Sequence, residues 1–219
     1  MSLLTGLLDA RFAVVEQPIA DYTAELEPEE QPYVARAAER RRLEFSTGRA
    51  CAHRALSRLG VAHAALLPGT DRMPIWPFGV VGSISHTENI CAAAVARRDD
   101  RLASVGIDIE PAEPLSDDLI ETICHADERD WIERAAAGER GLLARAVFCA
   151  KECAFKCQFP LTRKMLDFDD LTISIDHARG TFIAIFYRGV APFQRGAALG
   201  GRLRINDGFI VTAMTIEVG

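Results

Sequence analysis

The order of helix-like and strand-like segments constrains the fold of this chain more than any other feature. Residues 29–44 are rich in alanine, glutamate and arginine at helical spacing, and further helices are predicted over 48–59, 118–136 and 140–158. Alternating or β-rich runs predict strands over 12–18, 80–85, 90–96, 102–110, 171–177, 181–188, 202–206 and 209–217. Helices and strands therefore occur in both halves without regular alternation, which favours an α+β fold.

Irregular segments divide this pattern. Residues 111–117 carry two prolines and no clear period, so we place a hinge near 105–117 and expect one α+β half over 1–105 and another over 106–219. Residues 66–79 hold three prolines and two glycines and are predicted to be a loop. Ser46 and Thr47 are predicted to cap the helix that begins at residue 48.

Composition argues against several classes of protein. Lys and Arg number 25 against 31 Asp and Glu, and a net charge of −6 is unfavourable for a general nucleic-acid binder. No apolar run approaches the roughly 20 residues of a membrane span, and the first twelve residues lack the pattern of a signal peptide. Six unevenly spaced cysteines indicate reduced thiols, so we expect a cytoplasmic protein with neither membrane nor nucleic-acid partners.

The motif Gly106-Ile107-Asp108-Ile109-Glu110 is the clearest candidate site. Residues two apart on a strand face the same side, so Asp108 and Glu110 present two carboxylates together while the isoleucines face the other way. Two such charges repel unless a cation neutralises them, and hard oxygen ligands suit Mg²⁺. Taken alone, the pattern more often marks the solvent-facing edge of a half-buried strand.

A second candidate lies on the predicted helix 140–158, where Glu152 and Lys156 are four apart and share a face. Taken alone, such a pair is usually an exposed ion pair. Beside the two strand carboxylates, Glu152 would add a third metal ligand or a base, and Lys156 would bind a phosphate. The cysteines of the same helix have no CxxC or HxxxH partner and are interpreted as small core residues, namely Cys149, Cys153 and Cys157.

Three weaker features also suit a phosphorylated ligand. The small-residue strand end 82–87 would let a ligand approach the backbone, with Ser85 and His86 as donors, although a single histidine is more often structural. The loop 68–72 holds a glycine and an arginine that would wrap a nucleotide. Arginine binds phosphate bidentately, although a solvated helix face is the default explanation for the arginines at 36, 40, 41, 42, 49, 54 and 58.

In this order the motifs resemble the 4′-phosphopantetheinyl transferase superfamily, and its compact bacterial subgroup that serves siderophore, polyketide and nonribosomal peptide carrier proteins. The resemblance rests on VGSISH at 81–86, GIDIE at 106–110 and FCAKECAFK at 148–156. Further marks of the subgroup are RRRLEFSTGRACAHRAL at 40–56, P-x-W-P-x-G-V-V-G-S at 74–83 and FPLTRKMLDF at 159–168. The ordered set covers residues 36–168 and is specific as a set.

This resemblance implies two similar α+β halves related by pseudo-twofold symmetry, with coenzyme A in the cleft between them. It implies that a serine hydroxyl of an apo carrier protein attacks the β-phosphorus of coenzyme A, that the 4′-phosphopantetheine arm is transferred, and that 3′,5′-ADP leaves. Mg²⁺, with Mn²⁺ as a substitute, is the implied metal. The implied partners are acyl or peptidyl carrier domains of peptide synthetases, polyketide synthases or fatty acid synthase, and a monomer suffices because both halves supply the cleft.

Carried over position by position, the resemblance implies that Asp108, Glu110 and Glu152 hold the metal, and that Asp108, Glu152 and Lys156 are catalytic. For coenzyme A, the resemblance implies that its phosphates meet Arg41 and Arg49, and that its 3′-phosphate meets Ser85 and His86. Its diphosphate would lie near Asp108, Glu152 and Lys156. Its adenine side would meet Gly69, Asp71 and Arg72, and its pantetheine arm would meet Leu166. The chain departs from the subgroup at Ser85 and Thr87, because the subgroup often has Thr-His-Cys where this chain has Ser85-His86-Thr87. It also departs at Pro68, where a lysine is often found and for which Arg72 would substitute.

Two other classes of function stay open from the residues themselves. One is another Mg²⁺-dependent phosphate enzyme such as a nucleotide hydrolase, although no P-loop or Rossmann glycine motif supports it. The other is a carrier-protein or coenzyme A binding module that has lost its chemistry. The intact set of acidic residues and Lys156 favours the transferase over both.

Overall fold

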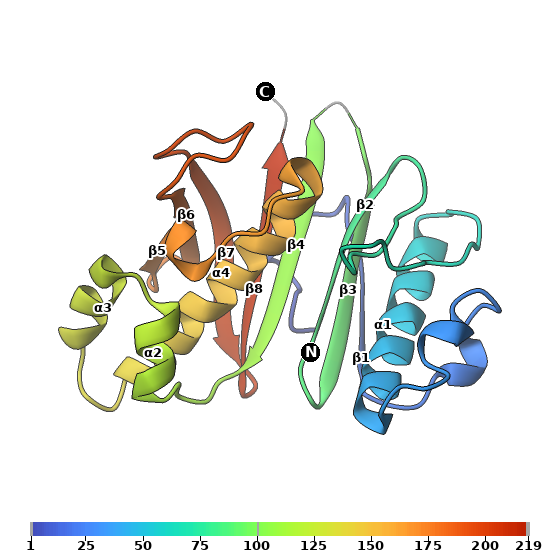
Figure 1. The fold of residues 1–219 in the computed structure, drawn as a ribbon, viewed down its shortest axis with the longest axis horizontal. Helices are drawn as coiled ribbons and strands as arrows, with labels where there is room; N and C mark the ends of the chain where they lie inside the picture. Colours follow the sequence, from blue (N-terminus) through green and yellow to red (C-terminus); the bar gives the residue numbers. More distant parts are fainter. Residues whose placement is uncertain (1, 100, 218–219) are drawn as a thin grey trace.

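The computed structural model describes residues 2–99 and 101–217, and within them the chain forms two antiparallel sheets with helices on their outer sides (Figure 1). The first sheet has the order β1-β3-β2, from β1 (Ala13–Pro18), β2 (Val80–His86) and β3 (Ile90–Arg97). The second has the order β4-β8-β7-β6-β5, from β4 (Leu102–Pro111), β5 (Leu171–Asp176), β6 (Thr181–Phe186), β7 (Ala198–Asn206) and β8 (Phe209–Glu217). The α+β prediction is confirmed.

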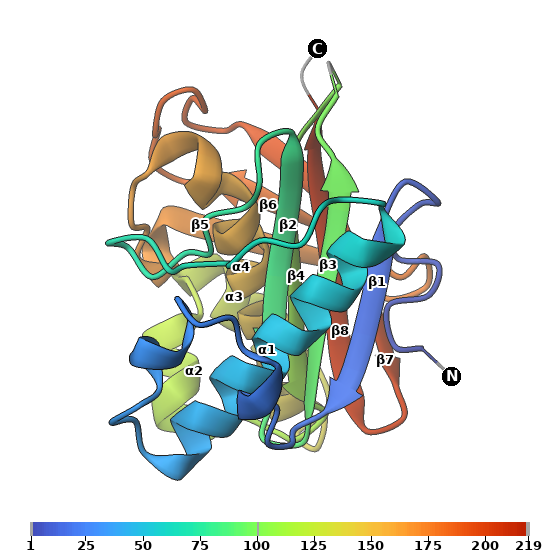
Figure 2. The ribbon, with the colours of Figure 1, turned by 90° about the vertical axis from the view of Figure 1, so that its right-hand side faces the viewer.

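A long helix packs on each sheet. Figure 2 looks onto α1 (Glu39–Arg58), which lies across the first sheet and buries Cys51, Ala55 and Leu56 against it. On the second sheet, α4 (Arg140–Thr162) buries its cysteine face. The shorter elements are α2 (Asp117–Ile123), α3 (Ala126–Glu133) and the 3₁₀ turns η1 (Thr23–Glu25), η2 (Gln31–Tyr33) and η3 (Phe168–Asp170).

Serine hydroxyls connect the two sheets where β2 lies beside β4. The hydroxyl oxygen of Ser83 accepts a hydrogen bond from the backbone N–H of Ile107 at 3.1 Å, and that of Ser85 accepts one from Ile109 at 3.2 Å. Because both serines lie two residues apart, they face the same side of β2 and reach β4 in register. The first sheet thereby places the Gly82–Thr87 motif directly against the GIDIE motif.

A glycine on β4 allows α4 to approach this strand closely. A Cβ atom at Gly106 would lie 2.2 Å from the carbonyl oxygen of Cys153, which no side chain tolerates. The thiols of Cys149, Cys153 and Cys157 are fully buried against β4 and β8, with the Cys153 thiol 3.2 Å from the carbonyl oxygen of Gly106. The prediction that these cysteines are core residues is confirmed, and the close contact fixes which residues of α4 face β4.

The N-terminal helix predictions were wrong in their boundaries. Residues 29–38 form turns and η2 rather than a helix, and α1 begins only at Glu39. A continuous α1 then runs through the predicted break at Ser46 and Thr47. These two side chains do not cap a helix. Thr47 Oγ accepts from the N–H of Ala20 and donates to its carbonyl, while Ser46 Oγ accepts from Tyr22.

Three further boundaries differ from the sequence prediction. The helix predicted over 118–136 is two helices, α2 and α3, because the chain turns at Cys124 and His125 caps α3. Helix α4 continues past Pro160 to Thr162, and Arg163, with φ of 55°, ends it in the left-handed conformation. Strand β7 begins at Ala198 instead of residue 202, because residues 198–201 also pair with β6.

Strand β4 belongs to the second sheet from Leu102 onward, so a boundary drawn at residue 105 falls inside this strand. The sheets have three and five strands, and the pseudo-twofold relation between the halves stays a prediction. Among the residues that the structure describes, no helix is long and apolar enough to cross a membrane.

Candidate active site

Three polar groups from three elements meet at the junction of the sheets. The Lys156 ammonium on α4 lies 2.6 Å from Asp108 Oδ1 on β4 and 3.1 Å from the hydroxyl of Ser85 on β2. The Ser85 hydroxyl in turn donates to the same Asp108 oxygen at 2.8 Å. Burial alone would lower the pKa of Lys156, but the charge and hydrogen bond of Asp108 outweigh it and raise the pKa. Lys156 is therefore a fixed cation at this junction.

The other carboxylate oxygen of Asp108 is the least satisfied group of the site. Asp108 is 3 % exposed, and its Oδ2 is buried without a hydrogen-bond partner within residues 2–99 and 101–217. A buried carboxylate oxygen without a donor is costly. This atom marks the point at which a cation or a donor from a ligand would be bound most favourably.

Glu110 lies two residues further along the same face of β4, as the sequence predicted. Burial and the negative charge of Asp108 raise the pKa of Glu110 to about 7, although the guanidinium of Arg145 lies 3.1 Å from its carboxylate. Arg145 lies on α4 seven residues before Glu152 and therefore on a similar helix face. Sequence reasoning missed Arg145, although this spacing from Glu152 and Lys156 was a usable signal.

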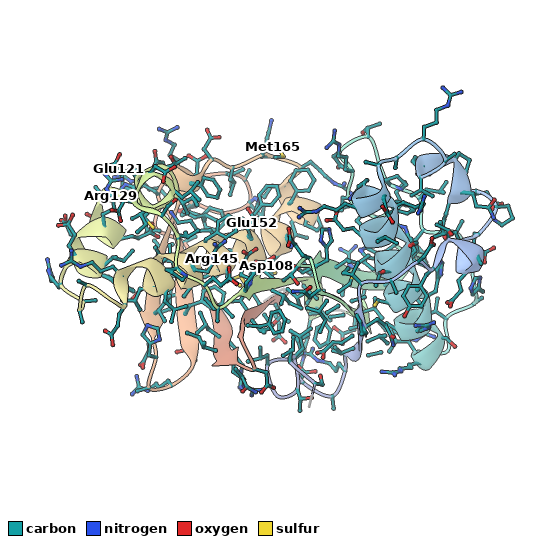
Figure 3. All side chains as sticks on the ribbon, turned by 90° about the horizontal axis from the view of Figure 1, so that it is seen from below. Asp108, Glu121, Arg129, Arg145, Glu152 and Met165 are labelled. Carbon is teal, nitrogen blue, oxygen red and sulfur yellow. The ribbon has the colours of Figure 1, made fainter. Side chains whose placement is uncertain are left out.

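Glu152 is half-buried on α4 and shares the central region of Figure 3 with Asp108 and Arg145. Its pKa is raised, first by burial and also by the charge of Asp108, while Lys156 lowers it. The negative charge of Asp108 thus repels the carboxylates of both Glu110 and Glu152. Repulsion of this kind disappears when a cation lies between the groups.

The donors present suit a divalent cation of the Mg²⁺ type. They are hard carboxylate oxygens, one of them an unpaired buried oxygen of Asp108. Within residues 2–99 and 101–217, no three His, Cys, Asp or Glu side chains are close enough together to form a ready metal site. Two of the carboxylates form ion pairs within the protein instead, Glu110 with Arg145 and Asp108 with Lys156. Among the described residues, these donors therefore fit the metal in kind, although they are not gathered into one cluster and internal cations hold two of them.

On the other side of the junction, His86 ends β2 and faces α1. Its Nε2 lies 3.9 Å from a carboxylate oxygen of Glu44, whose other oxygen accepts from Arg40 at 2.8 Å. Burial lowers the pKa of His86, Glu44 raises it, and the nearby cations Lys156 and Arg41 lower it further. In the absence of a bound anion this histidine therefore favours its neutral form.

The structure separates the two predicted phosphate arginines. Arg41 is exposed near the start of α1, with its guanidinium 5.8 Å from the Phe45 ring. Arg49 is 5 % exposed, stacks on Phe45 at 4.3 Å, and donates from Nε to the carbonyl of Leu66 at 2.6 Å. Burial lowers the pKa of Arg49 to about 10, with Glu30 acting against it. Part of this guanidinium is thus already engaged in holding the start of the 66–79 loop.

The 68–72 loop borders a cavity between the halves. A pocket of about 250 Å³ is lined by Arg72, Ser83, Phe155, Lys156 and Met165 together with seven further residues. Asp71 joins this loop to the end of α4 through an ion pair with Arg163 of 2.9 Å, and a Cβ at Gly69 would lie 2.9 Å from Asp71 Oδ1. The loop, β2 and α4 therefore enclose the pocket that Lys156 borders.

A second pocket, of about 360 Å³, lies on the other side of Phe155 and Met165. Its lining includes Glu152, Leu166 and Phe168. Figure 3 shows Met165 above Glu152, nearer the edge of the molecule. Of the predicted ligand residues, Asp71, Arg72 and Lys156 line the first pocket, and Glu152 and Leu166 line the second. The remaining predicted ligand residues line neither of these two pockets.

Comparison with known proteins identifies the family of this chain. Residues 29–96 match the family model described as the 4′-phosphopantetheinyl transferase N-terminal domain, and residues 104–203 match that of the 4′-phosphopantetheinyl transferase superfamily. The first match ends with β3 and the second begins within β4, so the candidate site draws residues from both. The chain belongs to the 4′-phosphopantetheinyl transferase superfamily, and it is an enzyme of this type.

Individual relatives share most of the chain. It is 41 % identical to the 4′-phosphopantetheinyl transferase Svp of Streptomyces mobaraensis, over 98 % of this chain and 89 % of Svp. It is 42 % identical to the 4′-phosphopantetheinyl transferase PptT of Mycobacterium tuberculosis, over 86 % of this chain and 85 % of PptT. A shorter match, 34 % identical over 55 % of the chain and 49 % of the relative, is to enterobactin synthase component D of Salmonella typhi.

Proposed function

We propose that this enzyme transfers the 4′-phosphopantetheine arm of coenzyme A to a serine hydroxyl of an apo carrier protein and releases 3′,5′-ADP. The observation that carries the proposal is the cluster of Asp108, Ser85 and Lys156 at the junction of the two family-matched regions. Two adjacent pockets that share Phe155 and Met165 give room for a long ligand, and Lys156 of this cluster lines one of them.

The cations of the site are proposed to hold the phosphates of coenzyme A. Lys156 binds the diphosphate, and His86 with Ser85 binds the 3′-phosphate, with Arg41 and Arg49 adding positive charge from α1. The supporting observations are the fixed ammonium of Lys156 and the position of His86 at the end of the neighbouring strand. Transfer of a phosphoryl-type group depends mainly on such positioning and charge stabilisation.

Gly69, Asp71 and Arg72 are proposed to border the adenine side, and Leu166 the pantetheine arm. Asp71 supports this role by tying its loop to Arg163 beside the first pocket, and Leu166 supports it by lining the second. The pocket that holds Leu166 is also lined by Phe155 and Phe168, and this apolar surface suits an alkyl-amide arm better than a phosphate.

Asp108, Glu110 and Glu152 are proposed to hold Mg²⁺, with Mn²⁺ as a substitute. When bound, such a cation supplies charge neutralisation at the diphosphate of coenzyme A. The unpaired oxygen of Asp108 and the raised pKa values of Glu110 and Glu152 support this ligand set. Lys156 and Arg145, which now neutralise two of these groups, then become available to the ligand.

Glu152 is also proposed as the base that takes the proton from the attacking serine hydroxyl. A base is most effective when its pKa lies near the working pH, and burial moves the pKa of Glu152 upward in that direction. Its carboxylate borders the pocket assigned to pantetheine, where the reacting serine must enter.

The proposed partners are acyl or peptidyl carrier domains of peptide synthetases, polyketide synthases or fatty acid synthase. Siderophore assembly is one setting, since a relative of this chain is an enterobactin synthase component. We further propose a monomer, because both pockets are built from this one chain, and a cytoplasmic location, because all six cysteines are free and buried.

A direct test incubates the purified protein with Mg²⁺, coenzyme A and an apo carrier protein, and measures the mass of the carrier. The expected result is a mass gain of one phosphopantetheine group with release of 3′,5′-ADP. Phosphate release without carrier modification would instead indicate a hydrolase, and coenzyme A binding without either reaction would indicate a binding module.

A further inference from the structure

A buried ion pair lies at the pocket that borders Glu152, and one of its members, Lys151, is itself a lining residue of that pocket. The side chains of Lys151 on α4 and Glu128 on α3 are 2 % and 1 % exposed, and their charged atoms lie 2.7 Å apart. Two charges removed from water are compensated only when the hydrogen bonds around them are also satisfied, and an apolar pair of the same volume is often as stable. Lys151 and Glu128 have no part in the proposed chemistry. We therefore infer that the hydrogen bonds of this pair, rather than its charges alone, are needed at this position.

The hydrogen bonds around the pair join several elements. The Lys151 ammonium donates to the carbonyl of Ile123, the last residue of α2, and to that of Phe168, the first residue of η3, each at 2.8 Å. The Glu128 carboxylate accepts from the N–H of His125 at 2.6 Å and from the N–H of Ile173 on β5. All three donors of the ammonium have acceptors, so its position is fully determined.

One carbonyl bound by Lys151 belongs to Phe168, a lining residue of the second pocket, and the other belongs to Ile123, which is adjacent in sequence to a lining residue. Thr122, which precedes Ile123, lines one side, and Leu166 and Phe168 line another. Lys151 lies immediately before Glu152 on α4. The ammonium therefore fixes both walls relative to the helix that carries Glu152.

We propose that Lys151 and Glu128 are positioning residues that hold the walls of this pocket around the pantetheine arm of coenzyme A. This inference rests on the proposed function, in particular on the assignment of pantetheine to the Leu166 side. An apolar pair would fill the same space but would leave the Ile123 and Phe168 carbonyls without a donor, and the walls would move relative to Glu152. The first pocket has no wall bonded to Lys151 or Glu128 among the contacts of the described residues.

The test compares the ligands that reach one or both pockets. The double variant Lys151→Met with Glu128→Gln removes both charges together, which avoids leaving one of them buried and unpaired. We expect its affinity for coenzyme A to fall about tenfold, while its affinity for 3′,5′-ADP, which lacks the arm, changes less than about twofold. Turnover with a carrier protein should fall by up to ~10²-fold, the scale of a misplaced reacting group.

Two further variants separate positioning from loss of stability. Glu128→Gln alone keeps Lys151 as the donor to both carbonyls but leaves its charge buried without a partner. It should therefore lower stability while affecting coenzyme A affinity per folded molecule less than the double variant does. Phe182→Leu reduces packing in the same hydrophobic core at a residue that does not line this pocket, and it serves as the control for destabilisation. Per folded molecule, Phe182→Leu should bind both ligands as the wild type does.

The outcomes are decisive in each case. Equal losses for coenzyme A and 3′,5′-ADP in the double variant, no loss for either, or the same selective loss in Phe182→Leu would overturn the positioning role. A wild-type protein that binds both ligands but modifies no carrier would instead refute the proposed function.

Discussion

The two long helices differ in how closely they pack on their sheets. On α1, the glycine at the contact is Gly48, where an added Cβ would lie 3.4 Å from a side-chain carbon of Ile84. At α4 the glycine belongs to the strand, and an added Cβ on Gly106 would lie 2.2 Å from the backbone of Cys153. The first contact involves a side chain able to adjust, whereas the second involves backbone on both sides.

This difference corresponds to what each helix presents at the junction of the sheets. Helix α4 brings Glu152 and Lys156 to the β4 carboxylates, where Lys156 makes a 2.6 Å contact that requires a fixed helix position. Helix α1 presents Glu44 near His86 at 3.9 Å, which is a longer and looser contact. The C-terminal half is therefore the more rigid side of the site, and the N-terminal half is the more adaptable.

The largest expected effect is on turnover in Glu152→Gln, which keeps the size of the side chain but removes its charge and basicity. If Glu152 is mainly the base, turnover should fall by ~10²–10⁴-fold and added Mg²⁺ should not restore it. If it is mainly a metal ligand, saturating Mg²⁺ should recover much of the rate. We expect partial recovery, measured as carrier mass gain against Mg²⁺ concentration.

Glu133→Gln is the matched control for Glu152→Gln, because Glu133 is an exposed acid on α3 and the substitution removes the same charge. Wild-type turnover in Glu152→Gln at ordinary Mg²⁺ would refute both roles of Glu152.

Asp108→Ala should also lower the rate of carrier modification by at least ~10²-fold, the scale of losing a main electrostatic group.

The packing comparison itself predicts the second effect. Gly106→Ala should lower the free energy of unfolding by about 3 kcal/mol or more, because neither strand nor helix backbone has room for a methyl group. Gly48→Ala should change it by no more than about 1 kcal/mol, since alanine favours the helix and its methyl meets only a side chain. Urea unfolding of the two variants measures both values, and equal losses would refute the difference in rigidity.

Much of the fold followed from local pattern, and the exceptions have physical causes. The Ile107 and Ile109 side chains lie on the opposite face to Asp108 and are fully buried, because strand alternation is a local property. Helix ends were predicted less well. Ser46 and Thr47 look like caps in sequence, but their hydroxyls bond to residues 20–22, a tertiary contact that no local pattern contains.

The candidate site shows the same division. Strand spacing predicted that Asp108 and Glu110 lie on one face of their strand. Helix spacing predicted that Glu152 and Lys156 lie on one face of their helix. The engagement of Glu110 with Arg145, and of Arg49 with the Leu66 carbonyl, depends on contacts between residues far apart in the chain. Internal ion pairs of this kind decide which charges are free, and they become visible only when the elements are packed.

A third, smaller effect concerns the adaptable side. His86→Ala should weaken coenzyme A binding by ~1–3 kcal/mol, the range of a charge-assisted hydrogen bond, and should have much less effect on 3′-dephospho-coenzyme A. Because the pKa of His86 is lowered in the free protein, binding of the 3′-phosphate should also take up a proton. Calorimetry in two buffers of different ionisation enthalpy measures this uptake.

The control for this substitution is His177→Ala, an exposed histidine in the turn between β5 and β6. It should leave both affinities and the proton uptake unchanged. Equal losses for both forms of the coenzyme in His86→Ala would place the histidine elsewhere than at the 3′-phosphate.

The smallest expected effect concerns pH and compares one buried glutamate from each half. Glu30, which is fully buried, accepts from His53 at 2.9 Å and from the N–H of Leu66 at 2.7 Å. Burial raises its pKa, but these bonds outweigh burial and hold the pKa below the usual 4.5. For Glu128, burial dominates over Lys151 and the pKa is raised.

The two shifts predict opposite slopes of stability with pH. A lowered pKa in the folded state means that Glu30 stabilises fully above about pH 4.5, and that this contribution is lost as the pH falls through its folded pKa. A raised pKa means that the contribution of Glu128 is fullest below about pH 4.5 and is lost as the pH rises through its folded pKa. As the pH falls from about 7 to about 3, Glu30→Gln should therefore cost progressively less unfolding free energy below about pH 4.5, while Glu128→Gln should cost progressively more above about pH 4.5. Urea unfolding of both variants and the wild type across this range measures the two slopes. Slopes of the same sign would contradict the prediction that folding shifts the pKa values of Glu30 and Glu128 in opposite directions.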